Sequence, residues 1–294
     1  MINNVMLVYF SGTGGTERIV NAFENELLKR DCIVSKVVLD YSKQASSDDP
    51  DSLLKSCDLV ILLFPVHAFD APLPIYHWIE KVNVANKKIA VLSVSGGGEA
   101  WPNTGCRNNC CKALEEKGFD IIYEKMMVMP SNWVFNVNDH KSMWLIKVIP
   151  DKVSQILDSI FQGKIRRTHF KKGFLQKYIT KLEKDNANKF AEDLKIDNNC
   201  FSCGSCAKCC PVNNIEIVDK KPVFKDKCVM CFRCIYACPS KAIKSNNFMV
   251  LKSGYNLKDV ETRMKGIQLP PIEKCFKGIM WKAVKNYLLD KDGC

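Results

Sequence analysis

Two short cysteine runs in the last third of the chain constrain its structure more than any other feature. Each run reads C-x2-C-x2-C-x3-C-P, and the eight cysteines are Cys200, Cys203, Cys206 and Cys210 before Pro211, and Cys228, Cys231, Cys234 and Cys238 before Pro239. Three thiolates on one tight loop can bind three corners of an iron–sulfur cubane. Zinc is the alternative, but zinc sites usually combine two separated CxxC pairs, which gives the middle cysteine and the proline no role. The duplicated spacing therefore predicts two [4Fe–4S] clusters.

The fourth cysteine of each run points toward the cluster of the other run. We therefore expect crossed ligand sets, in which cluster one is bound by Cys200, Cys203, Cys206 and Cys238, and cluster two by Cys228, Cys231, Cys234 and Cys210. Cys209 adjoins Cys210 but lacks its spacing and its proline, so we do not expect it to be a ligand. Between the runs, "NIEIVDKKPVF" alternates apolar and polar residues around "DKK", which predicts a β-hairpin.

The first half of the chain alternates strand-like and helical stretches. Apolar runs of strand character occupy residues 4–10, 32–39, 58–64, 88–95 and 120–129, and helical patterns separate them, notably at 17–30, 72–82 and 104–118. This alternation predicts an α/β domain, a doubly wound parallel five-stranded sheet with helices on both faces. Ligands of such sheets bind at the C-terminal ends of the strands.

The loop after the first strand has the composition of an anion site. Ser11, Thr13 and Thr16 supply hydroxyls, and Gly12, Gly14 and Gly15 allow backbone N–H groups to turn inward at a helix N-terminus. It is not a Walker A loop, because no lysine follows the glycines, and a dinucleotide fingerprint would need glycine where Glu17 stands. A merely tight turn is the alternative. A phosphate cradle without a basic side chain resembles the FMN site of flavodoxins.

Two later loops lie where flavodoxin-like folds surround the flavin ring. The first contributes Val66, His67 and Phe69, and the second Ser95, Gly96, Gly97, Gly98 and Trp101. An aromatic side chain can stack on the ring, and glycines let backbone amides approach its polar edge. Ordinary packing is the alternative for Phe69 and Trp101, and we expect His67 to form a loop hydrogen bond. Asp70 is the residue of the first loop that best tolerates positive φ, as a peptide flip beside the flavin would require.

The stretches "YFSGTGGTE", "FPVHAFDAP" and "SGGG", together with the two cysteine runs, resemble the fused "ferrodoxin" family of anaerobic bacteria. In that family a flavodoxin-like domain precedes a bacterial 2[4Fe–4S] ferredoxin-like domain. The resemblance implies one FMN and two [4Fe–4S] clusters in an electron-transfer role. It does not imply a defined substrate.

Charge and hydropathy limit the classes of binding partner that we expect. The net charge is +11, part of which offsets the negative charge of the cofactors, and the remainder could steer a redox partner protein with an acidic surface. Basic residues form no aromatic-interleaved platform, so we expect no nucleic acid. No run of about 18 uncharged apolar residues and no signal peptide occur, which predicts a cytoplasmic protein without a membrane span. The basic amphipathic stretch 273–294 could lie on a membrane, but we favour packing on the protein.

We expect four segments: a flavodoxin-like FMN-binding domain (1–165), a helical basic connector (166–195), a 2×[4Fe–4S] ferredoxin domain (196–248) and a C-terminal helical extension (249–294). The favoured hypothesis is an electron relay that links one-electron carriers to a one- or two-electron acceptor. A ferredoxin-fed, flavin-dependent reductase of a small molecule is the alternative, followed by a redox-sensing binding module. Cys106, Cys110 and Cys111 receive no role.

Overall fold

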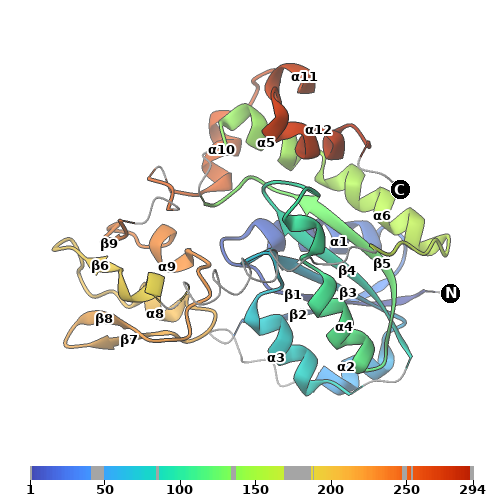
Figure 1. The fold of residues 1–294 in the computed structure, drawn as a ribbon, viewed down its shortest axis with the longest axis horizontal. Helices are drawn as coiled ribbons and strands as arrows, with labels where there is room; N and C mark the ends of the chain where they lie inside the picture. The colour runs from blue at the N-terminus through green and yellow to red at the C-terminus, as the bar shows by residue number, and fades with distance from the viewer. Residues whose placement is uncertain are drawn as a thin grey trace.

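In the computed structural model, residues 2–40, 50–83, 86–133, 137–168, 187, 189–246, 250–252 and 254–291 are described. They form a larger lobe around a five-stranded sheet and a smaller lobe beside it (Figure 1). The connector predicted at 166–195 falls mostly outside the described residues. Of its first residues, Arg166 continues alongside the sheet, where its N–H donates to the Ile122 carbonyl (3.0 Å) and its carbonyl accepts from Glu124 (2.8 Å).

The larger lobe is built on β1 (Asn4–Tyr9), β2 (Ile33–Val38), β3 (Leu59–Pro65), β4 (Lys87–Ser95) and β5 (Phe119–Val128). All are parallel, in the order β2-β1-β3-β4-β5. This is the strand order of flavodoxin-like doubly wound sheets, so the predicted fold class is confirmed.

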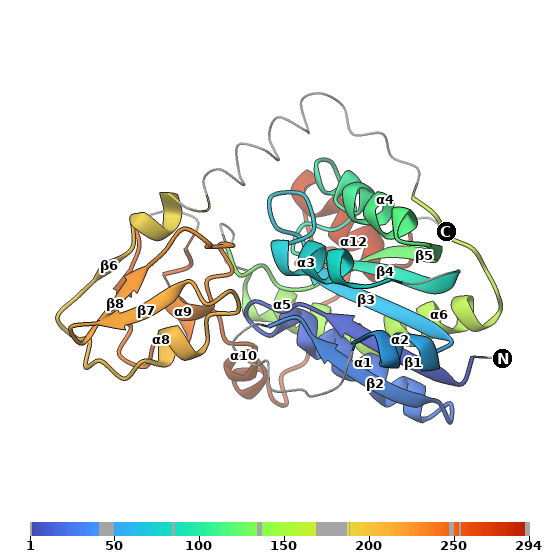
Figure 2. The ribbon, with the colours of Figure 1, turned by 90° about the horizontal axis from the view of Figure 1, so that it is seen from below.

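Helices cover both faces of this sheet (Figure 2). They are α1 (Gly15–Leu28), α2 (Pro50–Ser56), α3 (Leu73–Lys81), α4 (Asn108–Glu116), α5 (Asp139–Lys147) and α6 (Ile149–Phe161). Val5 and Leu7 of β1 pack with α1 and α6, whereas Met6 and Val8 pack with α2, α3 and α4. Each central strand is therefore apolar throughout, because its two faces contribute to two separate cores.

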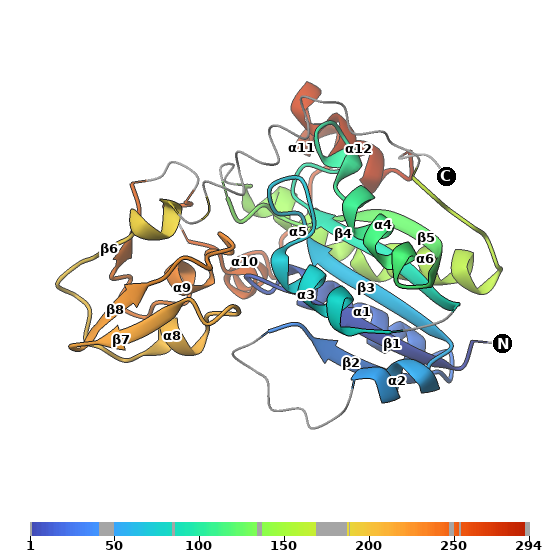
Figure 3. The same cartoon turned by 60° about the horizontal axis from the view of Figure 1, so that its bottom comes forward.

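The smaller lobe consists of two similar halves. Its strands are β6 (Lys195–Ile196), β7 (Ile215–Val218), β8 (Lys221–Phe224) and β9 (Ile243–Lys244), paired antiparallel as β6–β9 and β7–β8. The β7–β8 pair is the predicted hairpin and lies at the end of the lobe far from the sheet (Figure 3). The helices α8 (Ser205–Lys208) and α9 (Arg233–Tyr236) occupy equivalent places within the two cysteine runs.

The C-terminal segment returns to the larger lobe above the sheet (Figure 1). It forms α10 (Leu257–Arg263), α11 (Ile272–Cys275), the 3₁₀ turn η3 (Ile279–Trp281) and α12 (Lys282–Leu288). The amphipathic stretch 273–294 does not form one continuous helix, because Gly278 (φ 90°) separates α11 from η3 and α12. Phe276, Val284 and Tyr287 are buried in the core shared with α6. Within the described residues, no helix is both long and apolar enough to cross a membrane.

Candidate functional site

The phosphate loop, residues 11–16 between β1 and α1, contacts both lobes. Gly14 adopts φ 91° and begins α1, a conformation that favours glycine. The Ser11 hydroxyl accepts a hydrogen bond from the Glu17 N–H (3.2 Å), and the Thr13 hydroxyl accepts one from the Asn132 amide (2.9 Å). A Cβ on Gly12 would lie 3.1 Å from the Cβ of Cys231. The loop is therefore held directly against the second cysteine run.

Arg233, between the cysteines of that second run, binds the outer side of the loop. Its Nε donates to the Gly12 carbonyl (2.6 Å) and its Nη2 to the Ser11 carbonyl. Its Nη1 lies 2.5 Å from an Asp40 carboxylate oxygen and 2.9 Å from the Cys209 carbonyl. In a trans peptide the C=O and the following N–H point in opposite directions. The N–H groups of Gly12 and Thr13 therefore point away from Arg233, as donors for an anion.

A cavity of about 660 Å³ lies beside the phosphate loop, at the C-terminal ends of the strands. Its walls come from the loops after β1, β3, β4 and β5, from the second cysteine run and from the C-terminal segment. The predicted residues that line it are Ser11, Gly12, Thr13, Gly15, Thr16, Val66, His67, Phe69, Ser95, Gly96 and Gly97. Most of the candidate flavin contacts therefore share one space.

Three predicted residues lie outside this lining. Trp101 is 58% exposed and does not line the cavity, so a stacking role for it stays a prediction. Gly98 (φ 72°) instead approaches the backbone of Ala283, which lies 3.2 Å from the position of an added Cβ. Gly14 serves as the start of α1. The aromatic walls that sequence reasoning missed are Tyr76, Trp133, Phe232, Tyr255 and Trp281.

The loop after β3 makes a two-residue turn into the cavity. His67 and Asp70 exchange backbone hydrogen bonds of 3.0 and 2.9 Å, and Ala68 (φ 50°) and Phe69 (φ 55°) adopt the left-handed conformation between them. Asp70, which tolerates positive φ better than most residues, does not adopt it here, and its buried carboxylate accepts a hydrogen bond from the Tyr76 hydroxyl (2.7 Å). Asp70 thus fixes the end of the turn.

His67 joins this turn to the second cysteine run. Its ring forms a hydrogen bond to the backbone of Val229, as expected of a loop hydrogen-bonder. Burial lowers the pKa of His67 to about 4, against its usual value of 6.5. The imidazole is therefore neutral at physiological pH.

The glycine-rich loop after β4 is closely approached by the loop after β5. A Cβ on Gly96 would lie 2.7 Å from the Cβ of Ser131, a distance that real side chains do not tolerate. The Ser95 hydroxyl accepts hydrogen bonds from the Gly97 N–H (3.1 Å) and from the Asn103 amide (2.9 Å). Glycine at position 96 thus allows the two loops to line the cavity side by side.

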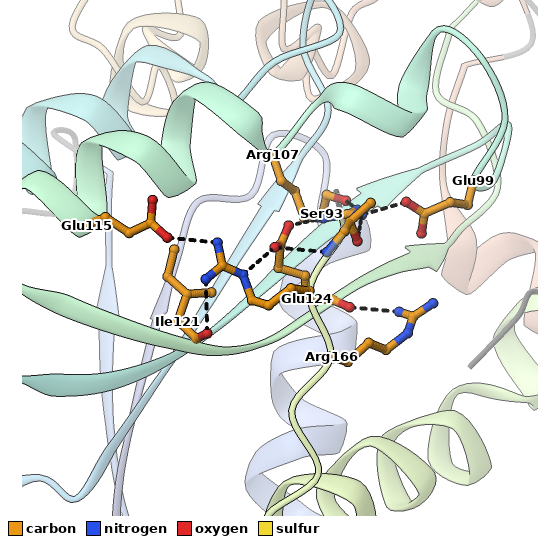
Figure 4. Close-up of polar contacts among 9 residues, drawn as sticks. Ser93, Glu99, Arg107, Glu115, Ile121, Glu124 and Arg166 are labelled. Atoms are coloured by element: carbon orange, nitrogen blue, oxygen red, sulfur yellow. Dashed lines mark hydrogen bonds and ion pairs between the residues drawn. The ribbon is translucent and has the colours of Figure 1, made fainter. Parts of the chain in front are cut away.

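A buried charge network fixes the far end of this glycine-rich loop (Figure 4). Arg107, 1% exposed, donates to Glu99 (2.5 Å), Ser93 (2.6 Å) and Glu124 (3.3 Å). Glu124 also accepts from Arg167 (2.9 Å). The paired charges tie the loop to β4, β5 and the segment after α6.

The buried cysteines of α4 are held as thiols. Burial raises the pKa of Cys111, and it raises that of Cys110 well above the usual range. Neither is a reactive thiolate.

The two cysteine runs face each other in the smaller lobe with matching backbones. Ser202 and Met230, Gly204 and Phe232, and Asn213 and Lys241 occupy equivalent positions, and all six have positive φ. Equivalent backbone N–H groups donate to sulfur, from Asn214 to Cys210 (3.2 Å) and from Ala242 to Cys238 (3.3 Å). Such bonds stabilise thiolates bound to a cluster.

Cysteines of the two runs lie near one another, and the crossed ligand sets stay a prediction. Cys206 interacts electrostatically with Cys203 and Cys238, and Cys231 does so with Cys228 and Cys210. Among the described residues, no three Cys, His, Asp or Glu side chains converge as ligands of one ion do. The thiolates of a cubane bind four separate irons and need not converge. The arrangement thus fits two clusters.

The two cluster sites differ in exposure. Cys203, a candidate ligand of cluster one, is exposed. Cys231 is buried against the phosphate loop, and Cys228 lines the cavity. Burial raises the pKa of Cys228 to about 11 and of Cys231 to about 12, so cluster binding must drive their deprotonation.

A family model described as a 4Fe–4S dicluster domain matches residues 193–239, which confirms the predicted iron–sulfur domain. No curated protein matches the chain. Solved structures with a similar fold include a flavodoxin from the domain Archaea, with 14% identity over 52% of this chain and 99% of that one (TM-score 0.35). Oxidised flavodoxin 1 from Bacillus cereus shares 14% identity over 53% and 98% (TM-score 0.38). Rubredoxin oxygen:oxidoreductase from Desulfovibrio gigas shares 16% over 54% and 37% (TM-score 0.37). The parallel strand order β2-β1-β3-β4-β5 by itself shows the flavodoxin-like fold.

Proposed function

We propose that this chain, a flavodoxin-like domain joined to a 4Fe–4S dicluster domain, relays electrons between its two [4Fe–4S] clusters and an FMN held in the cavity. The observation that carries the proposal is that the second cysteine run and the phosphate loop line the same cavity. Cys231 lies against Gly12, and Cys228 is part of the wall. A cofactor in the cavity would therefore lie beside cluster two.

The cavity residues fit FMN. The phosphate loop directs backbone N–H donors away from Arg233 and offers the hydroxyls of Ser11, Thr13 and Thr16, which suits a phosphate without a basic partner. The loops after β3 and β4 supply Phe69 and the close-packed Gly96 for a flat ring. FMN exchanges one or two electrons, whereas each cluster passes one, so the fusion links one-electron carriers to a one- or two-electron acceptor.

The order of the redox centres between solvent and the cavity follows from the exposure of their cysteines. Cluster one, with the exposed Cys203, faces solvent, whereas cluster two faces the cavity. The turn of the β7–β8 hairpin is basic, because Lys220 and Lys221 are both exposed there. The Ser202 hydroxyl of the first cysteine run donates to the Lys220 carbonyl, which places this turn beside cluster one. An acidic redox partner protein would dock there and exchange electrons with cluster one. The segments 1–165, 166–195, 196–248 and 249–294 serve this relay as flavin domain, connector, cluster domain and cavity cover.

A second candidate function is a flavin-dependent reductase of a small molecule, fed through the clusters. The cavity extends to Tyr76, Met280 and Trp281, an apolar region that could accommodate an aromatic acceptor. Turnover of a defined acceptor at the rate of cluster oxidation would favour this function over a relay between proteins.

The proposal is tested by an anaerobic reductive titration of the reconstituted protein, followed together by visible absorption and EPR spectroscopy. Flavin and cluster signals are expected to respond in one connected series with electrons equilibrating inside the molecule. Two intact clusters without any bound flavin would contradict the proposal.

A further inference from the structure

We infer that Arg233 is a positioning residue through which FMN binding depends on the second cysteine run. The inference rests on the proposed function, because it concerns how the phosphate loop becomes competent to bind the FMN phosphate. It adds a dependence of FMN affinity on the structure around cluster two.

Arg233 belongs to the cluster lobe by sequence and to the phosphate loop by its contacts. It lies in α9, between the cluster-two candidates Cys231 and Cys234. Its guanidinium reaches across the interface to the carbonyls of Ser11 and Gly12. The fold of the second run therefore sets the position of the Arg233 backbone, and the phosphate loop binds its guanidinium group.

The side chain acts by orientation and not as a counter-charge for the phosphate. The Asp40 carboxylate, 1% exposed, lies 2.5 Å from Nη1 and neutralises the guanidinium. The two loop carbonyls face Arg233, so the attached Gly12 and Thr13 N–H groups face the opposite way. Without this fork of donors, the carbonyls would lose their partners and those peptides could rotate.

The internal repeat shows that a cysteine run of this type does not need arginine here. Ser205 occupies the equivalent position in the first half, and its hydroxyl accepts a hydrogen bond from Cys203 within its own run (3.3 Å). Lys208 is the equivalent of Tyr236, whose hydroxyl donates to the Asn132 carbonyl in the loop after β5 (2.7 Å). Of these equivalent pairs, it is thus the second-run residues, Arg233 and Tyr236, that hydrogen-bond to the larger lobe.

The conformation of Phe232 supports the same specialisation. It adopts φ 60° where the first half has Gly204 (φ 71°), although aromatic residues rarely take this conformation. Phe232 lines the cavity and immediately precedes Arg233. Strain of this kind persists where the surrounding structure holds a functional arrangement.

The test compares equilibrium binding of FMN and riboflavin to cluster-loaded wild type, Arg233→Lys and Lys208→Met under anaerobic conditions. Lys208 lines the crevice on the outer side of the phosphate loop together with Arg233, so its replacement controls for the loss of a nearby positive charge. We expect Arg233→Lys to weaken FMN by about tenfold or more and riboflavin by less than about twofold, because riboflavin lacks the phosphate. Lys208→Met should change neither. Equal weakening of both ligands by Arg233→Lys, or weakening of neither, would overturn the inference.

Asp40→Asn provides a second variant that lies outside the cysteine runs. It should show the same selective loss of FMN with both clusters retained, as measured by iron and sulfide content. A loss of riboflavin as large as the loss of FMN would contradict the positioning role.

Hydrogen exchange separates this inference from the proposed function. In flavin-free, cluster-loaded Arg233→Lys, the amides of residues 11–16 should exchange faster than in the wild type, whereas Lys208→Met should match the wild type. Unchanged exchange in Arg233→Lys overturns the inference. A wild type that binds no FMN contradicts the proposed function instead, and leaves the exchange comparison able to decide on Arg233.

Discussion

Arg233 and Asp40 form an ion pair of 2.5 Å that joins the cluster lobe to the end of β2. Asp40 is almost fully buried, and Arg233 is 16% exposed at its side chain. Because the same guanidinium donates to two carbonyls of the phosphate loop, the pair connects cluster two with the candidate phosphate site.

Asp40→Asn should destabilise the protein. It leaves a largely buried guanidinium without its counter-charge, which typically costs about 3 kcal/mol. Chemical unfolding of cluster-loaded protein measures the change. The control is Lys112→Ala, which removes an exposed ion pair with Glu116 and should change the free energy of unfolding by less than about 1 kcal/mol. Equal effects of the two variants would show that the Asp40 pair is not structural.

Cysteine variants should affect flavin binding unequally. Cys203→Ala removes an exposed candidate ligand of cluster one, and it should reduce the iron content while leaving FMN affinity unchanged. Cys231→Ala removes a ligand beside Gly12, and it should also weaken FMN, by about tenfold, because the run that carries Arg233 loses its cluster. Iron analysis and flavin titration of both variants test this. Equal FMN affinities would contradict a dependence on the second run.

Gly96→Ala should change the shape of the cavity through a steric clash. The new Cβ would lie 2.7 Å from the Cβ of Ser131, so the loop after β5 must move away from the loop after β4. We expect FMN affinity to fall about tenfold or more, with both clusters retained. The double variant Gly96→Ala/Ser131→Gly removes the clashing Cβ and should recover much of the affinity. Failure of this rescue would locate the defect elsewhere.

His67 should make stability depend on pH in mildly acidic solution. Its folded pKa of about 4 lies below its unfolded value of 6.5, so between these values the unfolded chain binds more protons and stability falls as pH falls. From pH 6.5 to pH 5 this amounts to about 2 kcal/mol. His67→Gln should lose less stability than the wild type over this interval by about that amount, as measured by chemical unfolding. Parallel pH profiles would contradict the buried neutral imidazole.

The sequence predicted those features that depend on local spacing. Alternating strands and helices indicated the doubly wound sheet, and the cysteine spacing indicated the crossed ligand sets. Arg233 could not be predicted, because an arginine between two cysteines is equally compatible with solvent exposure, and its importance arises from a contact with Gly12 in a distant segment. The break of the C-terminal helix at Gly278 likewise depends on how that segment packs over the larger lobe.

Trp101 and Trp281 allow an experiment to compare a contact suggested by sequence proximity with one that arises only from the fold. Trp101 lies close in sequence to the glycine-rich loop but is 58% exposed, whereas Trp281 is far from that loop in sequence and lines the cavity. Trp281→Ala should weaken FMN by about fivefold or more, since stacking on an aromatic side chain contributes at least about 1 kcal/mol. Trp101→Ala should leave FMN affinity within about twofold of the wild type. Flavin fluorescence titration of both variants, with circular dichroism to verify folding, decides between them. If Trp101→Ala proved the more damaging, the ring would have to lie over the glycine-rich loop, and the C-terminal segment would not form a wall of the flavin site.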